Sequence, residues 1–302
     1  MLAARSLSRT ARRARLLQDR RHLSGTASPP PEALVRGGIR PESLPRHVAL
    51  VTDGNRRWAQ ARGLLTADGH EAGRRALEHA IWLSRAWGIR ALTVFAFSQE
   101  NFGRPKVLDP WPLEMFIPLA FQRLADVDPV LINFLNPQAE RTIRENVNEY
   151  ERKGIRLHVI GDPSRRPESL QEAAREAEEM TRSNSKLHLM LATCYSGRWE
   201  IVQACQALAR RAQGGLLRPE DIDDALLAGE LQTSAAAGEF SCPDLVIRTS
   251  GEQRLSNFLL WQSAYSELYF TDMLWPDFGE VEYLEALSWF QSRERRFGKR
   301  TA

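Results

Sequence analysis

The sequence has few cysteines, no paired-cysteine motif and no long apolar run. Among its 302 residues only Cys194, Cys205 and Cys242 are cysteines, and none of them belongs to a CxxC pair. This usage argues against a disulfide framework or a zinc site, and it favours a reducing compartment. No apolar run reaches the roughly 18 residues that a membrane-spanning helix requires. The sequence therefore gives no support for a disulfide-stapled domain or a transmembrane one.

Familiar nucleotide-binding and hydrolase motifs are also missing. There is no GxxxxGK[ST] loop, no GxGxxG after an apolar strand, no HExxH and no GxSxG. A P-loop, a dinucleotide cofactor, a zincin centre and a serine-hydrolase elbow are thus unsupported. The histidines His70 and His158 stand alone, and we expect His158, within an apolar strand, to be a core or edge residue rather than a ligand.

Acidic residues are scarce at the start of the chain. Residues 1–46 hold ten Arg, no Lys and three acids, a net charge of +7, whereas residues 47–302 carry 31 basic and 35 acidic side chains, a net charge of −4. The basic excess therefore gives no support for a nucleic-acid-binding surface. An Arg-, Ser- and Ala-rich segment without an acid before Asp19 is typical of an organellar presequence, followed here by a Pro- and Gly-containing linker to residue 46. The alternative is a disordered basic arm that binds an acidic partner.

From residue 47 onward, apolar strand-like runs alternate with amphipathic helical segments. Polar loops follow the strands, as in successive βαβ units of a parallel sheet. We expect one α/β domain over residues 47–298, with a mainly parallel central sheet flanked by helices, and a tail at 299–302. The expected strands are 47–52, 89–97, 154–161, 187–193 and 244–248. The expected helices are 69–88, 167–182, 199–211 and 280–295, with a short helical pair over 219–231.

The stretch His47–Gly73 combines a strand end with a basic helix start. Its apolar run breaks at Asp53 and Gly54, and a helix-compatible segment with Arg56 and Arg57 in its first turn follows. Unpaired N–H groups at a helix start, next to guanidinium groups, can bind an anion. A carboxylate beside such a site suits a Mg²⁺ ion that bridges to a phosphate. The alternative is an ordinary capped turn, because Asp, Gly and Asn are common turn formers.

A second polar cluster follows the last expected strand. Arg248, Arg254 and Ser256 fall on one loop, and guanidinium and hydroxyl groups suit the binding of a diphosphate. Glu267 lies in an aromatic, apolar run, where a carboxylate must be paired or metal-bound because burying it alone is costly. Asp53 and Glu267 are therefore the candidate metal-binding carboxylates.

Several blocks together resemble one family, the cis-prenyltransferases, which comprise undecaprenyl and dehydrodolichyl diphosphate synthases. The resemblance covers residues 47–298, and the order of the blocks makes it highly specific. In chain order the blocks are HVALVTDGNRRWAQARG, GHEAG, LTVFAFSQENFGRP, IRLHVIGD, DLVIRTSGEQRLSNFLLWQSAYSELYF and WPDFGE.

The resemblance implies a reaction and its partners. An enzyme of this family condenses isopentenyl diphosphate with an allylic diphosphate such as farnesyl diphosphate, and it makes a cis-polyprenyl diphosphate of the dehydrodolichyl type. It implies Mg²⁺ as cofactor, a hydrophobic tunnel for the growing chain, a homodimer and a product that associates with membranes. Arg296 and Gly298 match an element that family members lend to the neighbouring subunit's active site.

The resemblance also implies roles for individual residues. The allylic diphosphate would lie on the backbone after Asp53, beside Arg57 and close to His70, and isopentenyl diphosphate would be held by the loop after residue 248. The catalytic residues implied are Asp53, Ser98 and Asn101; the substrate-binding residues are Gly54, Asn55, Arg56, Arg57, Trp58, His70, Phe97, Glu100, Phe102, Arg104, Arg248, Arg254 and Ser256; and the metal ligands are Asp53 and Glu267.

The chain departs from the family pattern in three places. Phe102 stands where many relatives have Trp, and Thr66 where bacterial members often have a phosphate-binding Arg. The segment 105–154 is longer than the family usually has, and we expect an insertion at 117–139, either a real surface loop or an artefact of the gene model. Its prolines Pro118, Pro129 and Pro137 would interrupt a helical pattern that otherwise joins residues 114–116 to residues 140–150. Because the resemblance places this helix along the tunnel, the insertion bears on product length.

Two other functions remain alternatives. The first is a non-catalytic partner subunit of a heteromeric cis-prenyltransferase, although such subunits tend to lose the Asp and Arg motifs that this chain keeps. The second is a Mg²⁺-dependent phosphohydrolase, suggested only by carboxylates near an anion site. The presequence composition suits plastids and mitochondria alike, and the plant-like blocks favour the plastid.

Overall fold

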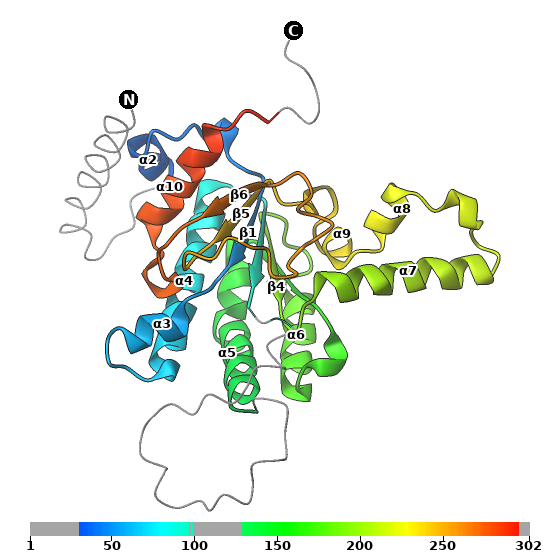
Figure 1. Cartoon of the computed structure of the whole chain (residues 1–302), viewed down its shortest axis with the longest axis horizontal. Helices are drawn as coiled ribbons and strands as arrows, with labels where there is room; N and C mark the ends of the chain where they lie inside the picture. The colour runs from blue at the N-terminus through cyan, green and yellow to red at the C-terminus, as the bar shows by residue number, and fades with distance from the viewer. Residues whose placement is uncertain (1–29, 97, 99–128, 296–302) are drawn as a thin grey trace, which may run out of the picture.

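The computed structural model describes residues 30–96, 98 and 129–295, and the fold is built on one six-stranded sheet (Figure 1). All strand pairs are parallel, in the order β3-β4-β2-β1-β5-β6. This arrangement confirms the predicted α/β class with a parallel sheet. The strands are β1 His47–Val51, β2 Ala91–Phe95, β3 Ile155–Ile160, β4 Leu187–Ala192, β5 Leu245–Arg248 and β6 Glu267–Phe270.

Helices cover both faces of the sheet and make the crossover connections, except that residues 249–266 join β5 to β6 without a helix. In the described part of the chain, no helix is both long and apolar enough to cross a bilayer. The α-helices are α2 Pro30–Arg36, α3 Asn55–Gln60, α4 Thr66–Trp87, α5 Pro129–Lys153, α6 Glu168–Met180, α7 Gly197–Gln213, α8 Asp224–Gly229, α9 Gln232–Ala237 and α10 Glu280–Gln291; the short 3-10 turns are η2 Pro41–Ser43, η5 Pro163–Arg165, η6 Pro219–Asp221, η7 Gly238–Phe240 and η8 Trp275–Asp277.

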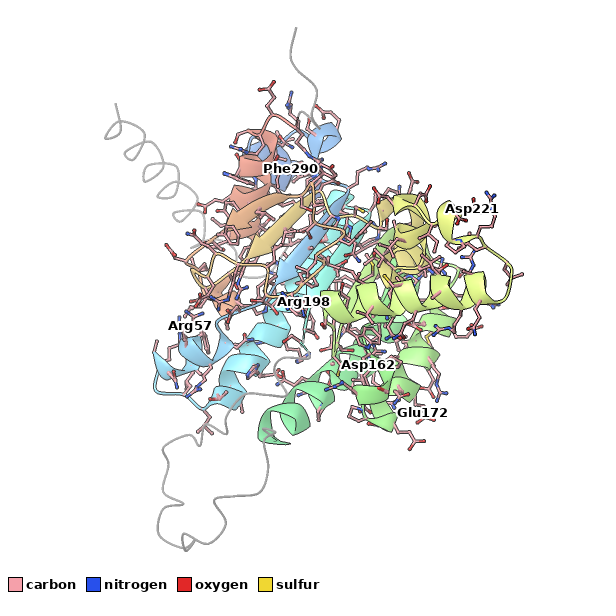
Figure 2. The ribbon with its side chains drawn as sticks, turned by 45° about the vertical axis from the view of Figure 1, so that its right-hand side comes forward. Arg57, Asp162, Glu172, Arg198, Asp221 and Phe290 are labelled. Carbon is pink, nitrogen blue, oxygen red and sulfur yellow. The ribbon has the colours of Figure 1, made fainter. Side chains whose placement is uncertain are left out.

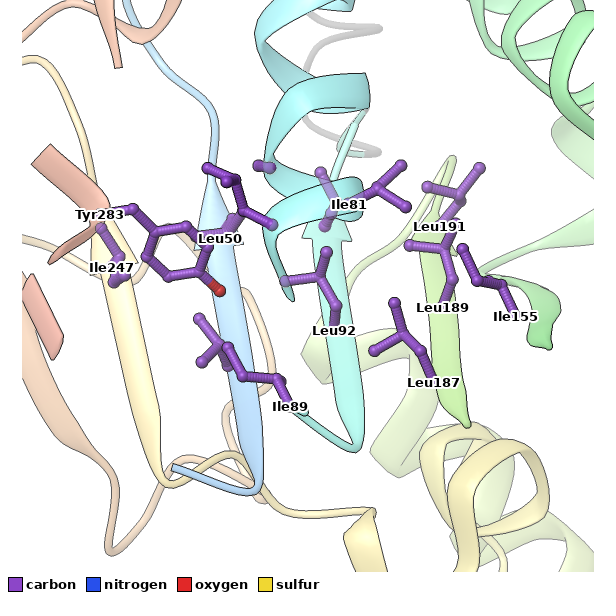
Figure 3. Packing of buried hydrophobic residues seen from close by; sticks show 14 of the residues in the cluster. Leu50, Ile81, Ile89, Leu92, Ile155, Leu187, Leu189, Leu191, Ile247 and Tyr283 are labelled. Atoms are coloured by element: carbon purple, nitrogen blue, oxygen red, sulfur yellow. The ribbon is translucent and has the colours of Figure 1, made fainter. Parts of the chain in front are cut away.

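The central strands are apolar on both sides because both faces of the sheet are covered. All five residues of β1 are buried, and so are all five of β2. Figure 3 shows Leu50 and Leu92 packing with Ile81 of α4 and Tyr283 of α10 in the larger of the two core clusters. The buried Tyr283 hydroxyl lies 2.9 Å from the Ser84 hydroxyl, so its polar atom is satisfied.

The position of β1 determines where ligands can bind. β1 pairs with β2 on one side and with β5 on the other, so the chain reverses the direction of sheet growth there. In open parallel sheets the crevice beyond the carboxyl ends of the strands at such a switch point is the usual ligand site. The segment that follows Val51 therefore lies where the fold itself favours chemistry.

The segment before the sheet differs from the sequence-based expectation. Residues 30–46 were expected to be a linker, but α2 forms there, with Pro30 at its first position, where its missing N–H costs nothing. Leu34 and Ile39 are both only 2% exposed and belong to the main core. The predicted linker is wrong for these residues because their apolar side chains find a surface on the folded domain.

The expected helix break before Glu140 is also wrong. α5 runs from Pro129 to Lys153 and contains Pro137 in its interior. A proline at the first helical position is well tolerated, and an interior proline removes one hydrogen bond without having to end the helix. The remainder of the expected insertion, residues 117–128, lies outside the described residues.

Candidate active site

The turn from β1 into α3 is set by tight packing around Gly54. Gly54 has φ of 113°, and a Cβ atom on it would lie 2.9 Å from Leu274 Cδ2. The Asp53 carbonyl accepts a hydrogen bond from the Trp275 N–H at 3.0 Å, and the Asp53 N–H donates to the Thr249 hydroxyl at 3.0 Å. Gly54 offers no side chain to cap α3. The first-turn N–H groups therefore remain directed toward an acceptor outside the helix.

Two glycines of α4 let α3 approach closely. A Cβ atom on Gly69 would lie 2.2 Å from the Asn55 backbone oxygen, and one on Gly73 would lie 2.2 Å from Asn55 Oδ1. The Gly73 carbonyl also accepts a hydrogen bond from Trp275 Nε1 at 2.8 Å. The GHEAG block is thus a packing surface that holds the start of α3 in place.

The Asp53 carboxylate lies between two guanidinium groups. Arg248 Nη2 is 3.1 Å from Asp53 Oδ2, and Arg57 Nη2 is 3.6 Å from Asp53 Oδ1. The Arg248 side chain is only 4% exposed, whereas the side chains of Asp53 and Arg57 are 36% and 48% exposed. Arg57 Nη1 also donates to the Ser250 carbonyl at 3.1 Å. The two predicted clusters, one after β1 and one after β5, therefore form a single site.

Arg248 connects that site to its own loop. Its Nη1 donates to the Arg254 carbonyl at 2.6 Å and to the Ser256 hydroxyl at 2.7 Å. Burial lowers the pKa of the Arg248 guanidinium and the Asp53 carboxylate opposes that shift, although a guanidinium keeps its charge in proteins. The Arg248 Nε is buried without a hydrogen-bond partner. A fixed, partly unpaired cation of this kind is suited to an anionic ligand.

Glu252 and Thr249 are site residues that the sequence reasoning missed. Glu252 pairs with Arg254 and lies 3.9 Å from Arg57, so one carboxylate links the two exposed guanidinium groups. Thr249 bonds to both the N–H and the carbonyl of Asp53. Their position in the polar run directly after a buried strand was the available signal. Their partners, however, lie on a distant part of the chain.

The other predicted residues are distributed around this site. Trp58 Nε1 donates to Asp277 Oδ1 at 2.8 Å, while Arg56 is exposed on α3. Burial lowers the pKa of His70 to about 4, so its imidazole is neutral near pH 7. Ser98 forms a parallel bridge with Tyr195 beyond the ends of β2 and β4. The predicted residues Phe97, Glu100, Asn101, Phe102, Arg104, Arg296 and Gly298 lie outside the described residues.

Glu267 does not join the Asp53 site within one chain. It is the first residue of β6 and is paired in register with Leu245, at the amino end of β5, whereas Asp53 lies beyond the carboxyl end of β1. Glu267 Oε2 accepts from Arg293 Nε at 3.1 Å, which satisfies the expectation that this carboxylate is paired. The register thus corrects the expectation that both carboxylates meet around one ion in a single chain.

The residues around Asp53 fit a magnesium ion. Among the described residues no group of three or more His, Cys, Asp and Glu side chains is arranged to hold a metal. Magnesium in phosphoryl sites is usually held by one or two carboxylates together with substrate phosphates and water. Asp53, a partly exposed carboxylate beside guanidinium groups, matches that donor set.

Figure 2 shows Arg57 on α3 and Arg198 at the start of α7, which follow the carboxyl ends of β1 and β4. The site is thus bordered by α3, α7 and the loop after β5. It presents guanidinium groups, a hydroxyl and open N–H groups around one carboxylate. Such a set of groups can bind diphosphates and stabilise negative charge as it develops on a leaving group.

Comparison with known proteins gives consistent matches. The prenyltransferase family model of undecaprenyl diphosphate synthases matches residues 51–109 and 121–298. A chloroplastic cis-prenyltransferase 4 of Solanum lycopersicum is 47% identical over 264 residues, covering 87% of this chain and 78% of that protein. A farnesyl-diphosphate-specific ditrans,polycis-undecaprenyl-diphosphate synthase of Pseudomonas putida is 44% identical over 259 residues, covering 86% and 92%.

A solved structure agrees with the sequence matches. The crystal structure of lavandulyl diphosphate synthase from Lavandula x intermedia, in complex with dimethylallyl diphosphate, has a TM-score of 0.73 at 40% sequence identity. The match covers 85% of this chain and 100% of that chain. The fold and the ordered sequence blocks therefore point to the same group of proteins.

Proposed function

Because the chain belongs to the undecaprenyl diphosphate synthase family of prenyltransferases, we propose that it condenses isopentenyl diphosphate with an allylic diphosphate primer to make a cis-polyprenyl diphosphate of the dehydrodolichyl type. It is a prenyl-group transferase and a catalytic member, since its relatives are named as synthases. A non-catalytic partner role is not supported.

One observation carries the proposal: Asp53 is flanked by Arg248 at 3.1 Å and by Arg57 at 3.6 Å. The two arginines come from opposite halves of the chain, so the site has two basic walls, one on each side of the Asp53 carboxylate. A reaction between two diphosphate esters needs two such walls. A phosphohydrolase would need only one.

The first wall is proposed to bind the allylic primer. Its diphosphate would accept hydrogen bonds from the N–H groups of Asn55 and Arg56 and from the Arg57 guanidinium. When bound, magnesium supplies positive charge against the leaving diphosphate. As the allylic carbon–oxygen bond breaks, these fixed donors stabilise the charge gained by the departing oxygen. His70, neutral at pH 7, can donate a hydrogen bond there without adding charge.

The second wall is proposed to bind isopentenyl diphosphate. Arg248, Arg254 and the Ser256 hydroxyl would hold its diphosphate, with Glu252 releasing Arg254 as the ligand takes its place. The double bond of isopentenyl diphosphate attacks the allylic carbon, and a carbon–carbon bond replaces the broken bond to the primer diphosphate. A proton then passes from the neighbouring carbon to the released diphosphate. That proton loss creates the new cis double bond. Ser98, Glu100, Asn101 and Arg104 are proposed to lie over the reacting centre, with Phe97, Phe102 and Trp58 beside the primer.

The cofactor, assembly and location are part of the same proposal. We propose that Asp53 would hold a Mg²⁺ ion, which would supply positive charge to the reaction, and that the chain forms a homodimer in which Arg296 and Gly298 reach the neighbouring subunit's site. In such a dimer Glu267 can serve the metal only from across the interface, since its own chain places it away from Asp53. The chloroplastic relatives and the basic start of the chain support a plastid location.

The test is an elongation assay with labelled isopentenyl diphosphate, Mg²⁺ and allylic primers of several lengths. The wild-type chain should give elongated products, and Asp53→Ala should reduce turnover by about a thousandfold or more while the far-UV circular dichroism stays unchanged. Release of phosphate without elongation would favour a phosphohydrolase. Turnover that survives Asp53→Ala would refute the assigned role of the carboxylate.

A further inference from the structure

The loop that carries the second wall is held by the start of α7. The Asn257 carbonyl accepts a hydrogen bond from the Gly197 N–H at 2.7 Å, and its Oδ1 accepts one from the Arg198 N–H at 2.9 Å. Its Nδ2 donates to the Ser196 hydroxyl at 2.7 Å. A Cβ atom on Gly197 would lie 2.9 Å from the Asn257 carbonyl oxygen, so only glycine allows this approach.

The same loop is in a conformation that it would not adopt alone. Ser256, Asn257 and Leu259 have φ values of 48°, 61° and 44°, in the left-handed region that non-glycine residues rarely occupy. Asn tolerates this region, but Ser and Leu do so at a cost, and such strain persists only where the surroundings impose it. Phe258, fully buried, stacks on Phe95 with ring centroids 4.5 Å apart and so anchors the middle of the loop.

Glu200 in the first turn of α7 supplies the second anchor. Its carboxylate is buried, and the residue is 2% exposed. It accepts hydrogen bonds from the Tyr195 hydroxyl at 2.5 Å, from Gln262 Nε2 at 2.9 Å and from the Gln232 N–H at 2.9 Å. A buried carboxylate must have all its partners in place. Glu200 therefore holds Tyr195, Gln262 and Gln232 in place. Of these three residues, Gln262 lies at the end of the strained loop.

We propose that Glu200 is a positioning residue for the second diphosphate site, an inference that rests on the proposed function. Glu200 holds Gln262, while the N-terminal turn of α7 holds Asn257. Because the loop is held at Asn257 and at Gln262, the Ser256 hydroxyl and the Arg254 carbonyl stay in hydrogen-bond contact with Arg248 Nη1. Glu200 itself contacts neither substrate.

The inference distinguishes the two walls. The first wall is held by Thr249, by Trp275 and by the glycines of α4, none of which bonds to Glu200. A disturbance at Glu200 should thus affect isopentenyl diphosphate more than the primer, because its path to Asp53 runs through Arg248. A residue with a purely structural role would instead lower stability or affect both substrates alike.

The test is the near-isosteric variant Glu200→Gln in the full chain. Its NH₂ group replaces one carboxylate oxygen: in the place of Oε2 it faces Gln262 Nε2, and in the place of Oε1 it faces the Gln232 N–H. Both of these partners are donors, so one of the two hydrogen bonds is lost in either orientation. We expect KM for isopentenyl diphosphate to rise on the order of tenfold, with KM for the primer within about twofold of wild type. Glu230→Gln, which removes the Arg211–Glu230 ion pair between α7 and the C-terminal end of α8, is the matched control and should leave both KM values unchanged.

Two further variants keep the test decisive if Glu200→Gln folds poorly. Tyr195→Phe removes one hydrogen bond to the carboxylate and should raise KM for isopentenyl diphosphate by a smaller factor. The double variant Glu200→Gln with Gln262→Glu exchanges the two side chains, so an amide can again donate to a carboxylate across this contact. It should recover part of the affinity for isopentenyl diphosphate that Glu200→Gln loses. Equal rises in both KM values, or a fall in melting temperature with unchanged KM in each variant, would overturn the inference.

Calorimetric binding of isopentenyl diphosphate separates this inference from the function it rests on. If wild type neither elongates primers nor binds isopentenyl diphosphate, the proposed function fails, and the positioning role fails with it. If wild type elongates primers while Glu200→Gln binds isopentenyl diphosphate with wild-type affinity, only the positioning role is refuted.

Discussion

Gly69→Ala tests how closely the site depends on the contact between α3 and α4. An alanine Cβ at this position would lie 2.2 Å from the Asn55 backbone oxygen and 3.0 Å from Ala59 Cβ, whereas ordinary van der Waals contact begins at 3.4 Å. The obstructing atom belongs to the backbone, so no side-chain rotation can relieve the clash. The start of α3 must move by about 1 Å, and it carries the first-wall donors with it.

The expected effects on stability and activity differ in size. Overpacking costs about 1–3 kcal/mol, and the better helix propensity of alanine returns up to about 1 kcal/mol. The net loss should therefore be at most about 3 kcal/mol. Each kcal/mol corresponds to a fall of about 2–4 °C in melting temperature in a domain of this size. A displacement of about 1 Å at a positioned donor can reduce turnover about a hundredfold. A domain that loses this much stability can still be mostly folded, so turnover should fall by more than the unfolded fraction explains.

Urea unfolding followed by circular dichroism, together with initial rates of isopentenyl diphosphate incorporation, measures both quantities. Gly229→Ala is the control, because no atom lies within 4 Å of its added Cβ. That variant should be neutral or more stable by up to about 1 kcal/mol, with unchanged rates. If Gly69→Ala keeps its rate to within about threefold while remaining folded, the close approach of α3 and α4 does not position the donors.

Two further predictions concern protons and thiols. Burial lowers the pKa of His47 to about 4, below the value of about 6.5 in the unfolded chain; the unfolded state therefore binds more protons between these values, and stability should fall as pH decreases from 6.5 toward 4. Urea unfolding from about pH 4.5 to 6.5 measures the slope of the unfolding free energy against pH. His47→Gln should lower this slope by up to about 1.4 kcal/mol per pH unit, the value for one proton, and equal slopes in the variant and wild type would contradict the lowered pKa of His47. Cys194 is fully buried and its burial raises the pKa of its thiol to about 11, while Cys205 and Cys242 are exposed. A thiol-specific disulfide reagent should thus modify two thiols quickly and the third only after unfolding, and three fast reactions would disprove the burial.

Local patterns accounted for the strands and helices that were predicted correctly. The apolar run from His47 and the one from Ile155 became β1 and β3, and polar residues at their ends lie at one edge of the sheet. Such patterns work because a buried parallel strand needs apolar side chains on both faces over several consecutive residues. The errors came where tertiary packing overrode a local signal. α2 formed in a proline-rich stretch because its apolar side chains are buried against α4, and α5 passed through Pro137.

The site divides in the same way. The residue types and the ordered blocks were enough to predict a diphosphate site around Asp53 and a second one around Arg248. The resemblance carried by those blocks also predicted the family. What the sequence could not provide was the contact between the two walls. Arg248 and Asp53 are 195 positions apart, and only the pairing of β1 with β5 brings their side chains together.

Tertiary structure alone decided the roles of residues whose partners are distant. Glu267 appeared equivalent to Asp53 as a candidate carboxylate, yet parallel pairing places it at the amino end of β6, because side chains follow the direction and register of their strand. No sequence pattern marks Glu200 as a special residue. Its role follows from the hydrogen bonds that its carboxylate accepts from Tyr195 and Gln262. The sequence by itself was enough to predict the fold class, the family and the guanidinium and carboxylate groups of the candidate site. The three-dimensional packing decided which groups meet, since hydrogen bonds and ion pairs act over a few ångströms of space rather than along the chain.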